Sequence, residues 1–198
     1  MLKLLVIYYY SGEIMFLQRA SRSFFISNVW LQNIVVTFAG AAILALLSQI
    51  AISLPFTPVP ITGQTLGVAL LALTLGRNRG LSSVVLYLML GAAGLPVFAQ
   101  AQSGLVFGPT MGYLIGMLLA TVLMGSLADK GWTSSFKKTL FAAFMGTVIT
   151  FVVGVSVLAF FIPAKMLLVA GVLPFLPGSL IKDTLAASVA YKVRKSVK

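Results

Sequence analysis

The few charged residues of this 198-residue chain separate long apolar stretches from one another. The chain has 14 Lys and Arg residues and only three Asp and Glu residues, and 60% of its residues are hydrophobic. A soluble domain carries about 25% charged residues and cannot keep so much apolar surface in water. Because a helix of about 20 apolar residues crosses the hydrocarbon core of a bilayer, the sequence predicts an all-α integral membrane protein.

Six apolar stretches are candidates for crossing the lipid bilayer. We place them at residues 34–54, 60–76, 81–99, 110–128, 138–162 and 167–191. Twelve of the 14 basic residues lie in the N-terminal arm, in the second and fourth connections, and in the C-terminal tail. Lys and Arg concentrate on the cytoplasmic side of a membrane protein. The pattern therefore predicts a six-helix bundle in the plasma or inner membrane with both termini in the cytoplasm; five or seven spans, with the N-terminal stretch inserted, are the alternative.

Residues 1–30 are predicted to form an N-terminal arm, and residues 31–198 a single membrane domain. Phe and Leu residues of the arm interleave with Arg19 and Arg22, which is typical of a cytoplasmic helix lying on the membrane surface. Met15 is an alternative start of the chain. The net charge of +11 would indicate a nucleic-acid partner in a soluble protein. Here the basic residues flank apolar segments, so they indicate attraction to an anionic leaflet, and no nucleic-acid partner is expected.

The composition also excludes several kinds of chemistry. The chain has no cysteine and no histidine, which excludes thiolate nucleophiles, thiolate or imidazole metal sites and His-based triads. Its acidic residues are Glu13, Asp129 and Asp183, too few and too scattered for a catalytic carboxylate pair or a magnesium site. No Gly-rich phosphate-binding loop is present. We therefore expect no enzymatic activity, no metal and no cofactor.

Two connections predicted to face outward carry polar but uncharged side chains. The first, residues 54–65, contains three prolines, which stiffen the segment that leads to Gln64 and Thr65. The second, residues 99–113, is uncharged and Gly-rich, as lids and binding loops often are. Its candidate ligand-binding residues are Gln100, Gln102, Ser103, Gly104 and Tyr113.

Alternative roles are open for some of these residues. Gln64 has the alternative of bonding an unpaired carbonyl at a helix end, and Tyr113 that of anchoring its helix at the membrane interface. Gly108, Gly112 and Gly116 recur at every fourth position. Such a stripe of small residues favours close helix packing over ligand contact.

Lys182 and Asp183 lie inside the last predicted span, about one helical turn below its outer rim. An ionisable residue within a membrane is a functional candidate. Neighbouring residues on a helix point about 100° apart, so these two need not pair. We predict that Lys182 binds an anionic ligand and that Asp183 is either a further ligand contact or a polar partner of another helix. The outer side of the chain thus predicts a pocket for a small amphipathic anion.

From about residue 40 to its end, the chain resembles the BioY family, the biotin-specific substrate-binding (S) components of energy-coupling factor (ECF) transporters. Four segments carry most of the resemblance, namely residues 56–65, 87–98, 108–116 and 171–182. The resemblance implies a six-helix S component that captures biotin from outside. It also implies partnership with a transmembrane coupling subunit and two cytoplasmic ATPases, which would hydrolyse the ATP.

The resemblance further implies roles for individual residues. Lys182 would meet the carboxylate of biotin, while Tyr113 would flank its fused ring. The ureido head would meet some of Gln64, Thr65, Gln100, Gln102, Ser103 and Ser179. The family usually has an acidic residue where this chain has Ser179, so a related vitamin or a precursor such as desthiobiotin is an alternative ligand. Alternatives from other classes are a stand-alone carrier or channel and, third, a membrane-embedded enzyme.

S components of this type dock on the coupling subunit through small residues of the first helix. Ala41 and Ala45 have the four-residue spacing that permits close contact between helices. Internal packing within the chain is the alternative role of this pair.

Overall fold

The computed structural model of the chain describes residues 28–104 and 107–196. The predicted surface helix of the N-terminal arm lies outside these residues. The chain divides into two compact units, residues 1–35 and 36–198. The described part of the first unit is the beginning of helix α2 (Val29–Ser48), where the backbone N–H of Trp30 donates to Asn28 Oδ1 at 3.0 Å.

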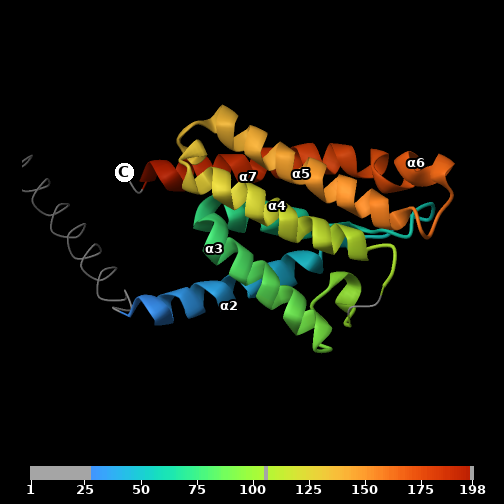
Figure 1. The fold of residues 1–198 in the computed structure, drawn as a ribbon, viewed down its shortest axis with the longest axis horizontal. Helices are drawn as coiled ribbons and strands as arrows, with labels where there is room; N and C mark the ends of the chain where they lie inside the picture. The colour runs from blue at the N-terminus through green and yellow to red at the C-terminus, as the bar shows by residue number, and fades with distance from the viewer. Residues whose placement is uncertain (1–27, 105–106, 197–198) are drawn as a thin grey trace, which may run out of the picture. The chain divides into compact units, whose positions relative to one another are not determined.

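The second unit is built almost entirely of helices. Four of them form its main body (Figure 1): α3 (Gln64–Ala92), α4 (Met111–Asp129), α5 (Phe136–Leu158) and α7 (Leu176–Ser196). Shorter elements join them: η1 (Ala99–Ala101), η2 (Trp132–Ser134), η3 (Ala164–Met166), α6 (Leu167–Gly171) and η4 (Leu173–Phe175). The two strands β1 (Ala51–Ile52) and β2 (Ile61–Thr62) pair antiparallel, with Ala51 opposite Thr62.

Within residues 28–104 and 107–196, four helical segments are long and apolar enough to cross a membrane, which confirms the multi-pass helical class. They are Val29–Ser48, Met111–Asp129, Phe136–Leu158 and Ala164–Ser196. Helix α3 contains most of the second and third predicted stretches, 60–76 and 81–99. The last predicted stretch is interrupted between α6 and α7, where Pro174 cannot donate a backbone hydrogen bond.

Helix α3 reverses direction at Gly76. This residue has φ +79° and ψ −176°, a conformation available essentially to glycine alone. Gln64 and Tyr87 hydrogen-bond at 2.5 Å, although a straight helix would separate them by about 35 Å. Asp129 Oδ2 accepts the backbone N–H of Arg77 at 3.1 Å, at the start of the second half of α3. Helix α3 is therefore a hairpin of two helical segments.

Helices α4 and α5 approach each other closely at two glycines. A Cβ atom on Gly116 would lie 2.8 Å from Thr150 Cα, and one on Gly112 would lie 2.6 Å from Val157 Cβ. Close packing is thus the role of these two members of the predicted glycine stripe. Gly108, the third, lines the cavity described below.

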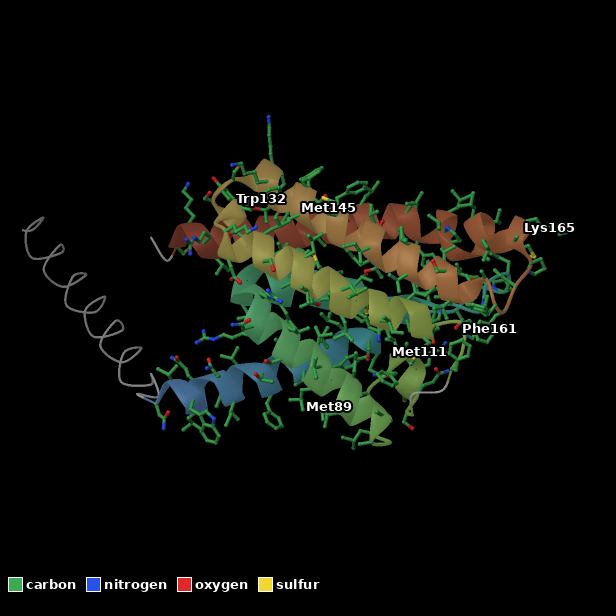
Figure 2. The ribbon with its side chains drawn as sticks, in the orientation of Figure 1. Met89, Met111, Trp132, Met145, Phe161 and Lys165 are labelled. Carbon is green, nitrogen blue, oxygen red and sulfur yellow. The ribbon has the colours of Figure 1, made fainter. Side chains whose placement is uncertain are left out.

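The outer faces of the bundle are apolar. Exposed large side chains recur at every fourth position on two helices: Phe144, Val148 and Val152 on α5, and Ile181, Leu185 and Val189 on α7. Figure 2 shows Met89 and Met145 on such outer faces as well. Apolar surface of this extent needs an apolar solvent, so these stripes are the lipid-facing sides of the helices.

The two alanines predicted to contact a partner differ in how deeply they are buried. Ala41 is only 1% exposed and belongs to the main apolar core, whereas Ala45 is half-buried against that core. The position of Ala41 agrees with the alternative role of internal packing.

Candidate functional site

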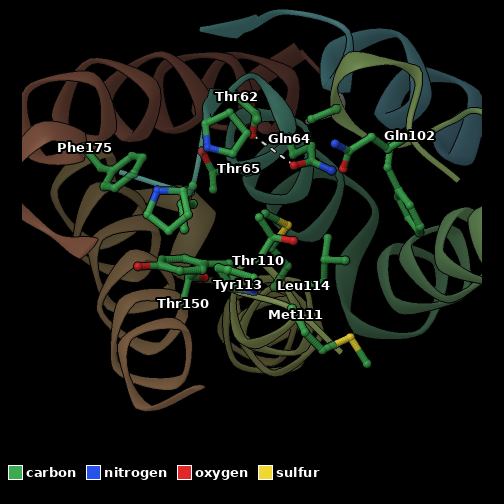
Figure 3. Close-up of a pocket in the computed structure, with 18 of the residues that line it drawn as sticks. Thr62, Gln64, Thr65, Gln102, Thr110, Met111, Tyr113, Leu114, Thr150 and Phe175 are labelled. Atoms are coloured by element: carbon green, nitrogen blue, oxygen red, sulfur yellow. Dashed lines mark hydrogen bonds between the residues drawn. The ribbon is translucent and has the colours of Figure 1, made fainter. Parts of the chain in front are cut away.

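A cavity of about 620 Å³ lies in the second unit, between the beginnings of α3, α4 and α7 and the loop around η1. Ligand pockets for small molecules span about 300–1,000 Å³, so this cavity accommodates a compact metabolite. Figure 3 shows Thr62, Gln64 and Thr65 from β2 and α3 on one side of the cavity, with the ring of Tyr113 across from them and Phe175 at its flank. Eight of the ten predicted ligand-binding residues line the cavity: Gln64, Thr65, Gln102, Ser103, Gly104, Tyr113, Ser179 and Lys182.

Lys182 is the basic residue that lines this cavity. Its Nζ donates to the backbone carbonyl of Thr62 at 3.0 Å and to Thr65 Oγ1 at 2.8 Å. An ammonium group has three hydrogens, so one remains for a ligand. The side chain therefore does not extend to the membrane surface; it is held against the chain entering α3.

Gln64 is 5% exposed, and both ends of its amide are engaged. Its Nε2 donates to the hydroxyl of Tyr87 at 2.5 Å, and its Oε1 accepts from Thr62 Oγ1 at 3.0 Å (Figure 3). Its partners are thus two hydroxyl groups rather than the helix-end carbonyl of the alternative prediction. These bonds fix the orientation of the amide and leave one N–H hydrogen of Nε2 for other contacts.

Tyr113 forms one wall of the cavity. It is 7% exposed, and its hydroxyl donates to the backbone carbonyl of Gly171 at 2.8 Å. Its ring packs beside Phe175, with the ring centroids 6.2 Å apart, and against the backbone of Gly154. A buried ring with a satisfied hydroxyl belongs to the cavity wall, which distinguishes it from an interfacial anchor.

The loop that carries η1 is tied to the end of α2. Ser48 Oγ donates to the carbonyl of Val97 at 2.5 Å. Gln49 Nε2 donates to the carbonyl of Phe98 at 3.1 Å, and Gln49 Oε1 accepts the backbone N–H of Ala101 at 3.1 Å. Sequence reasoning missed Ser48 and Gln49, although two adjacent polar residues within the apolar stretch 34–54 are a visible signal.

Two predicted ligand-binding residues do not line the cavity. The side chain of Gln100 donates to the hydroxyl of Ser53, and its backbone adopts φ +59°. Asp183 is 5% exposed and accepts the hydroxyl of Thr147 from α5, at 2.9 Å to Oδ1 and 3.0 Å to Oδ2. Thr147 itself lines the cavity. Asp183 thus acts as a polar partner of another helix, one of its two predicted roles.

The site offers few groups for metal chemistry. No cluster of three or more His, Cys, Asp or Glu side chains suited to a metal ion occurs within residues 28–104 and 107–196. Its functional groups are instead one ammonium, two amides, several hydroxyls and aromatic rings. Such a set binds a small molecule by hydrogen bonds and apolar contact.

A bundle of lipid-facing helices around one amphipathic cavity defines a membrane protein that binds a small molecule. The comparisons with known proteins make this class specific. The BioY family profile matches residues 18–198, and the chain belongs to the BioY family.

Named relatives and a solved structure agree with this assignment. The chain is 40% identical over 147 residues to the "Biotin transporter BioY" of Thermotoga maritima, covering 73% of this chain and 86% of that protein. It is 37% identical over 165 residues to "Biotin transporter BioY2" of Lactococcus lactis, covering 80% and 87%. The structure is similar to a crystal structure of "the S-component for biotin from an ECF-type ABC transporter", with a TM-score of 0.77 and 29% identity over 85% of this chain and 94% of that one.

Proposed function

We propose that this chain is the biotin-binding S component of an ECF uptake transporter, which captures biotin at the outer side of the cell membrane. The observation that carries the proposal is the amphipathic cavity, in a fold that matches a biotin S component with a TM-score of 0.77. The curated relatives are named biotin transporters. The chain is a transporter component and not an enzyme.

We place the anchor of the ligand at Lys182. Its third ammonium hydrogen is available beside the bonds to Thr62 and Thr65. A carboxylate is the strongest acceptor that biotin offers to an ammonium group, so the side-chain carboxylate of biotin is its proposed partner. The fused ring would then pack against Tyr113 and Phe175, while Gln102, Ser103 and Gly104 would cover the ligand from the loop after η1.

We propose six membrane crossings, two of which are the halves of the α3 hairpin. The basic residues Arg77 and Arg79 directly follow the reversal at Gly76, which favours a cytoplasmic position for it. Both termini would then be cytoplasmic.

The proposed partners are a transmembrane coupling subunit and two cytoplasmic ATPases, because the sequence has no ATP-binding loop of its own. The first helix is the proposed docking surface. Ala45, which is half-buried, is more accessible there than the buried Ala41.

The test is equilibrium binding of radiolabelled biotin to the purified full chain in nanodiscs. We expect saturable binding in the nanomolar-to-micromolar range. Lys182→Ala should weaken it by about 10- to 150-fold, the value of a charge-assisted hydrogen bond of about 1.5–3 kcal/mol. Lys165→Ala, which removes an exposed lysine, is the matched control and should bind normally. Absence of saturable biotin binding by the wild type would reject the proposed function.

Repeating the titrations with biotinamide tests the orientation of the ligand. If Lys182 contacts the carboxylate, amidation weakens binding to the wild type strongly and to Lys182→Ala only slightly. Equal losses in both proteins would show that Lys182 contacts another oxygen, such as the ureido carbonyl.

A further inference from the structure

The hydroxyl of Thr147 is bonded unlike other hydroxyls of the helices. Thr74, Thr121 and Thr150 each donate to the backbone carbonyl four residues earlier in their own helix. Thr147 instead donates across the helix interface to the carboxylate of Asp183 on α7. An ionised carboxylate only accepts hydrogen bonds, so this contact fixes the direction of the Thr147 O–H.

This direction determines what Thr147 presents to the cavity. A hydroxyl has one hydrogen and two lone pairs, and Asp183 takes the hydrogen. Thr147 also lines the cavity, so in any hydrogen bond between its hydroxyl and a ligand Thr147 would be the acceptor. Two other cavity-lining hydroxyls have their hydrogens engaged as well: Thr150 with the carbonyl of Gly146 at 3.0 Å, and Ser179 with that of Leu176 at 2.9 Å.

Donors remain at several other positions of the lining, including the side chains of Gln102, Ser103 and Thr110. Lys182 has one ammonium hydrogen left, and the Gln64 amide has one N–H left, after the bonds described above. The lining thus offers donors at several positions, whereas the three hydroxyls on α5 and α7 whose hydrogens are engaged can only accept a hydrogen bond from a ligand. An acceptor buried without a donor is costly, so these hydroxyls favour a ligand that brings N–H groups.

We propose that Thr147, oriented by Asp183, accepts a hydrogen bond from an N–H group of the ligand and thereby selects ligands that carry one. Thr147 is the contact residue and Asp183 a positioning residue. The inference rests on the proposed function, because the ureido ring is the part of biotin that bears N–H groups. An analogue with an oxygen in place of that N–H is predicted to bind poorly.

The experiment measures the Kd of biotin and of two analogues, each with one ureido N–H replaced by oxygen, for the full chain in nanodiscs. One of the analogues should bind the wild type about 5- to 150-fold more weakly than biotin, since it leaves the Thr147 acceptor without a donor. Thr147→Val keeps the shape of the side chain but removes the hydroxyl. In this variant we expect the ratio of the Kd of that analogue to the Kd of biotin to fall to about threefold or less.

Three further variants separate recognition from folding. Thr147→Ser retains the hydroxyl, so its ratio of the analogue's Kd to the Kd of biotin should equal that of the wild type. Thr121→Val removes a buried hydroxyl on α4 that bonds within its own helix, and it should leave the ratio unchanged. Asp183→Asn should narrow the ratio, because its amide NH₂ can donate to Thr147 Oγ1 and turn the hydroxyl hydrogen toward the cavity.

The experiment distinguishes a failure of the proposed role of Thr147 from a failure of the proposed function. If the wild type binds biotin and Thr147→Val retains the full ratio for both analogues, the role of Thr147 is rejected and the proposed function stands. An unchanged ratio in Asp183→Asn rejects the positioning role of Asp183. If the wild type shows no saturable biotin binding, the proposed function fails, and this inference fails with it.

Discussion

At the scale of single residues, the position of Tyr113 depends on a glycine of the neighbouring helix. A Cβ atom on Gly154 would lie 2.5 Å from Tyr113 Cε1. Gly154→Ala should therefore displace the ring and break its bond to the carbonyl of Gly171. Overpacking of this kind costs about 1–3 kcal/mol. We expect a lower midpoint of thermal unfolding in detergent and weaker biotin binding.

Gly178 on α7 provides the matched control. The nearest side-chain atom to a Cβ added there is Lys182 Cε, at 3.9 Å, which is an ordinary contact. Gly178→Ala should be neutral or stabilising by up to about 1 kcal/mol, since alanine favours a helix over glycine. Equal losses of stability in the two variants would contradict the packing argument.

The sequence identified many of the cavity residues but not their partners. A charge within an apolar stretch is costly, which indicates a functional role for Lys182, and a stiff Pro-rich segment leads to Gln64, which indicates a fixed position for that amide. The bond of Gln64 to Tyr87 and the bonds of Lys182 to Thr62 and Thr65 join residues far apart in sequence. Periodicity and composition contain no information on such contacts, which arise only when the helices pack.

At the scale of secondary-structure elements, Gln49 holds the loop around η1 in place. Its side chain bonds the backbone of that loop at Phe98 and Ala101, and both residues line the cavity. Gln49→Ala should loosen the loop and accelerate the dissociation of biotin by about 5- to 30-fold, the value of one or two hydrogen bonds.

A chase experiment with excess unlabelled biotin measures this dissociation rate. Gln32→Ala, at the start of the same helix, is the control and should release biotin at the wild-type rate. Because the predicted change concerns release, the association rate should change much less. Unaltered release from Gln49→Ala would show that the loop does not depend on this side chain.

The turn within α3 makes a second prediction at this scale. Gly76 has φ +79°, and a Cβ atom there would collide with Asp129 Oδ1. Gly76→Ala should cost about 1–3 kcal/mol from backbone strain, in addition to the loss of the bond between Asp129 and the backbone of Arg77. Differential scanning fluorimetry of the purified protein measures the resulting fall in the unfolding midpoint.

A substitution at Gly131 distinguishes the effect of backbone strain from that of a collision with a neighbouring side chain. Gly131 also has a positive φ, +81°, but nothing lies within 4 Å of an added Cβ. Gly131→Ala should therefore destabilise the protein less than Gly76→Ala does. The expected loss of stability is about 1–2 kcal/mol, from the left-handed backbone conformation alone. A Gly131→Ala loss as large as that of Gly76→Ala would exclude the collision with Asp129 as a cause.

Sequence patterns predicted most helices of this fold and missed its irregular segments. The apolar stretches at 110–128 and 138–162 nearly coincide with α4 and α5. The first predicted stretch, 34–54, is displaced toward the C-terminus, because α2 already begins at Val29 and ends at Ser48, after which the chain continues into β1. A two-residue strand pair has too few side chains to produce an alternating pattern, and its pairing joins residues on either side of a Pro-rich loop.

At the scale of the whole molecule, the number of membrane crossings is the main topological question. The described helices offer two arrangements. In the six-crossing arrangement both halves of α3 span the bilayer and place the turn at Gly76 in the cytoplasm. In a four-crossing arrangement α3 stays on the outer side, while the other spans and both termini keep the same orientation. The Arg residues at positions 77 and 79 favour the first arrangement.

Because the native chain contains no cysteine, single-cysteine variants can distinguish these arrangements without background labelling. Three exposed positions are suitable: Asn78 after the α3 turn, Ser134 between α4 and α5, and Ala164 between α5 and α6. Figure 2 shows Trp132 and Lys165, which lie close in sequence to the last two positions, at opposite ends of the bundle. A membrane-impermeant maleimide should label Ala164→Cys in intact cells and Ser134→Cys only after permeabilisation. Both arrangements share these outcomes, so these two variants calibrate the assay.

Asn78→Cys is the variant that discriminates between the two arrangements. If the chain crosses six times, this cysteine is cytoplasmic and reacts only after permeabilisation, as Ser134→Cys does. Labelling of Asn78→Cys in intact cells would instead place the α3 turn outside and leave four crossings. Such a result would put the exposed apolar side chains of α3, such as Met89 at 62% exposure, in water, where each costs about 1.5–3 kcal/mol relative to an apolar environment. Six crossings avoid this cost and satisfy the charge asymmetry, and we therefore expect labelling only after permeabilisation.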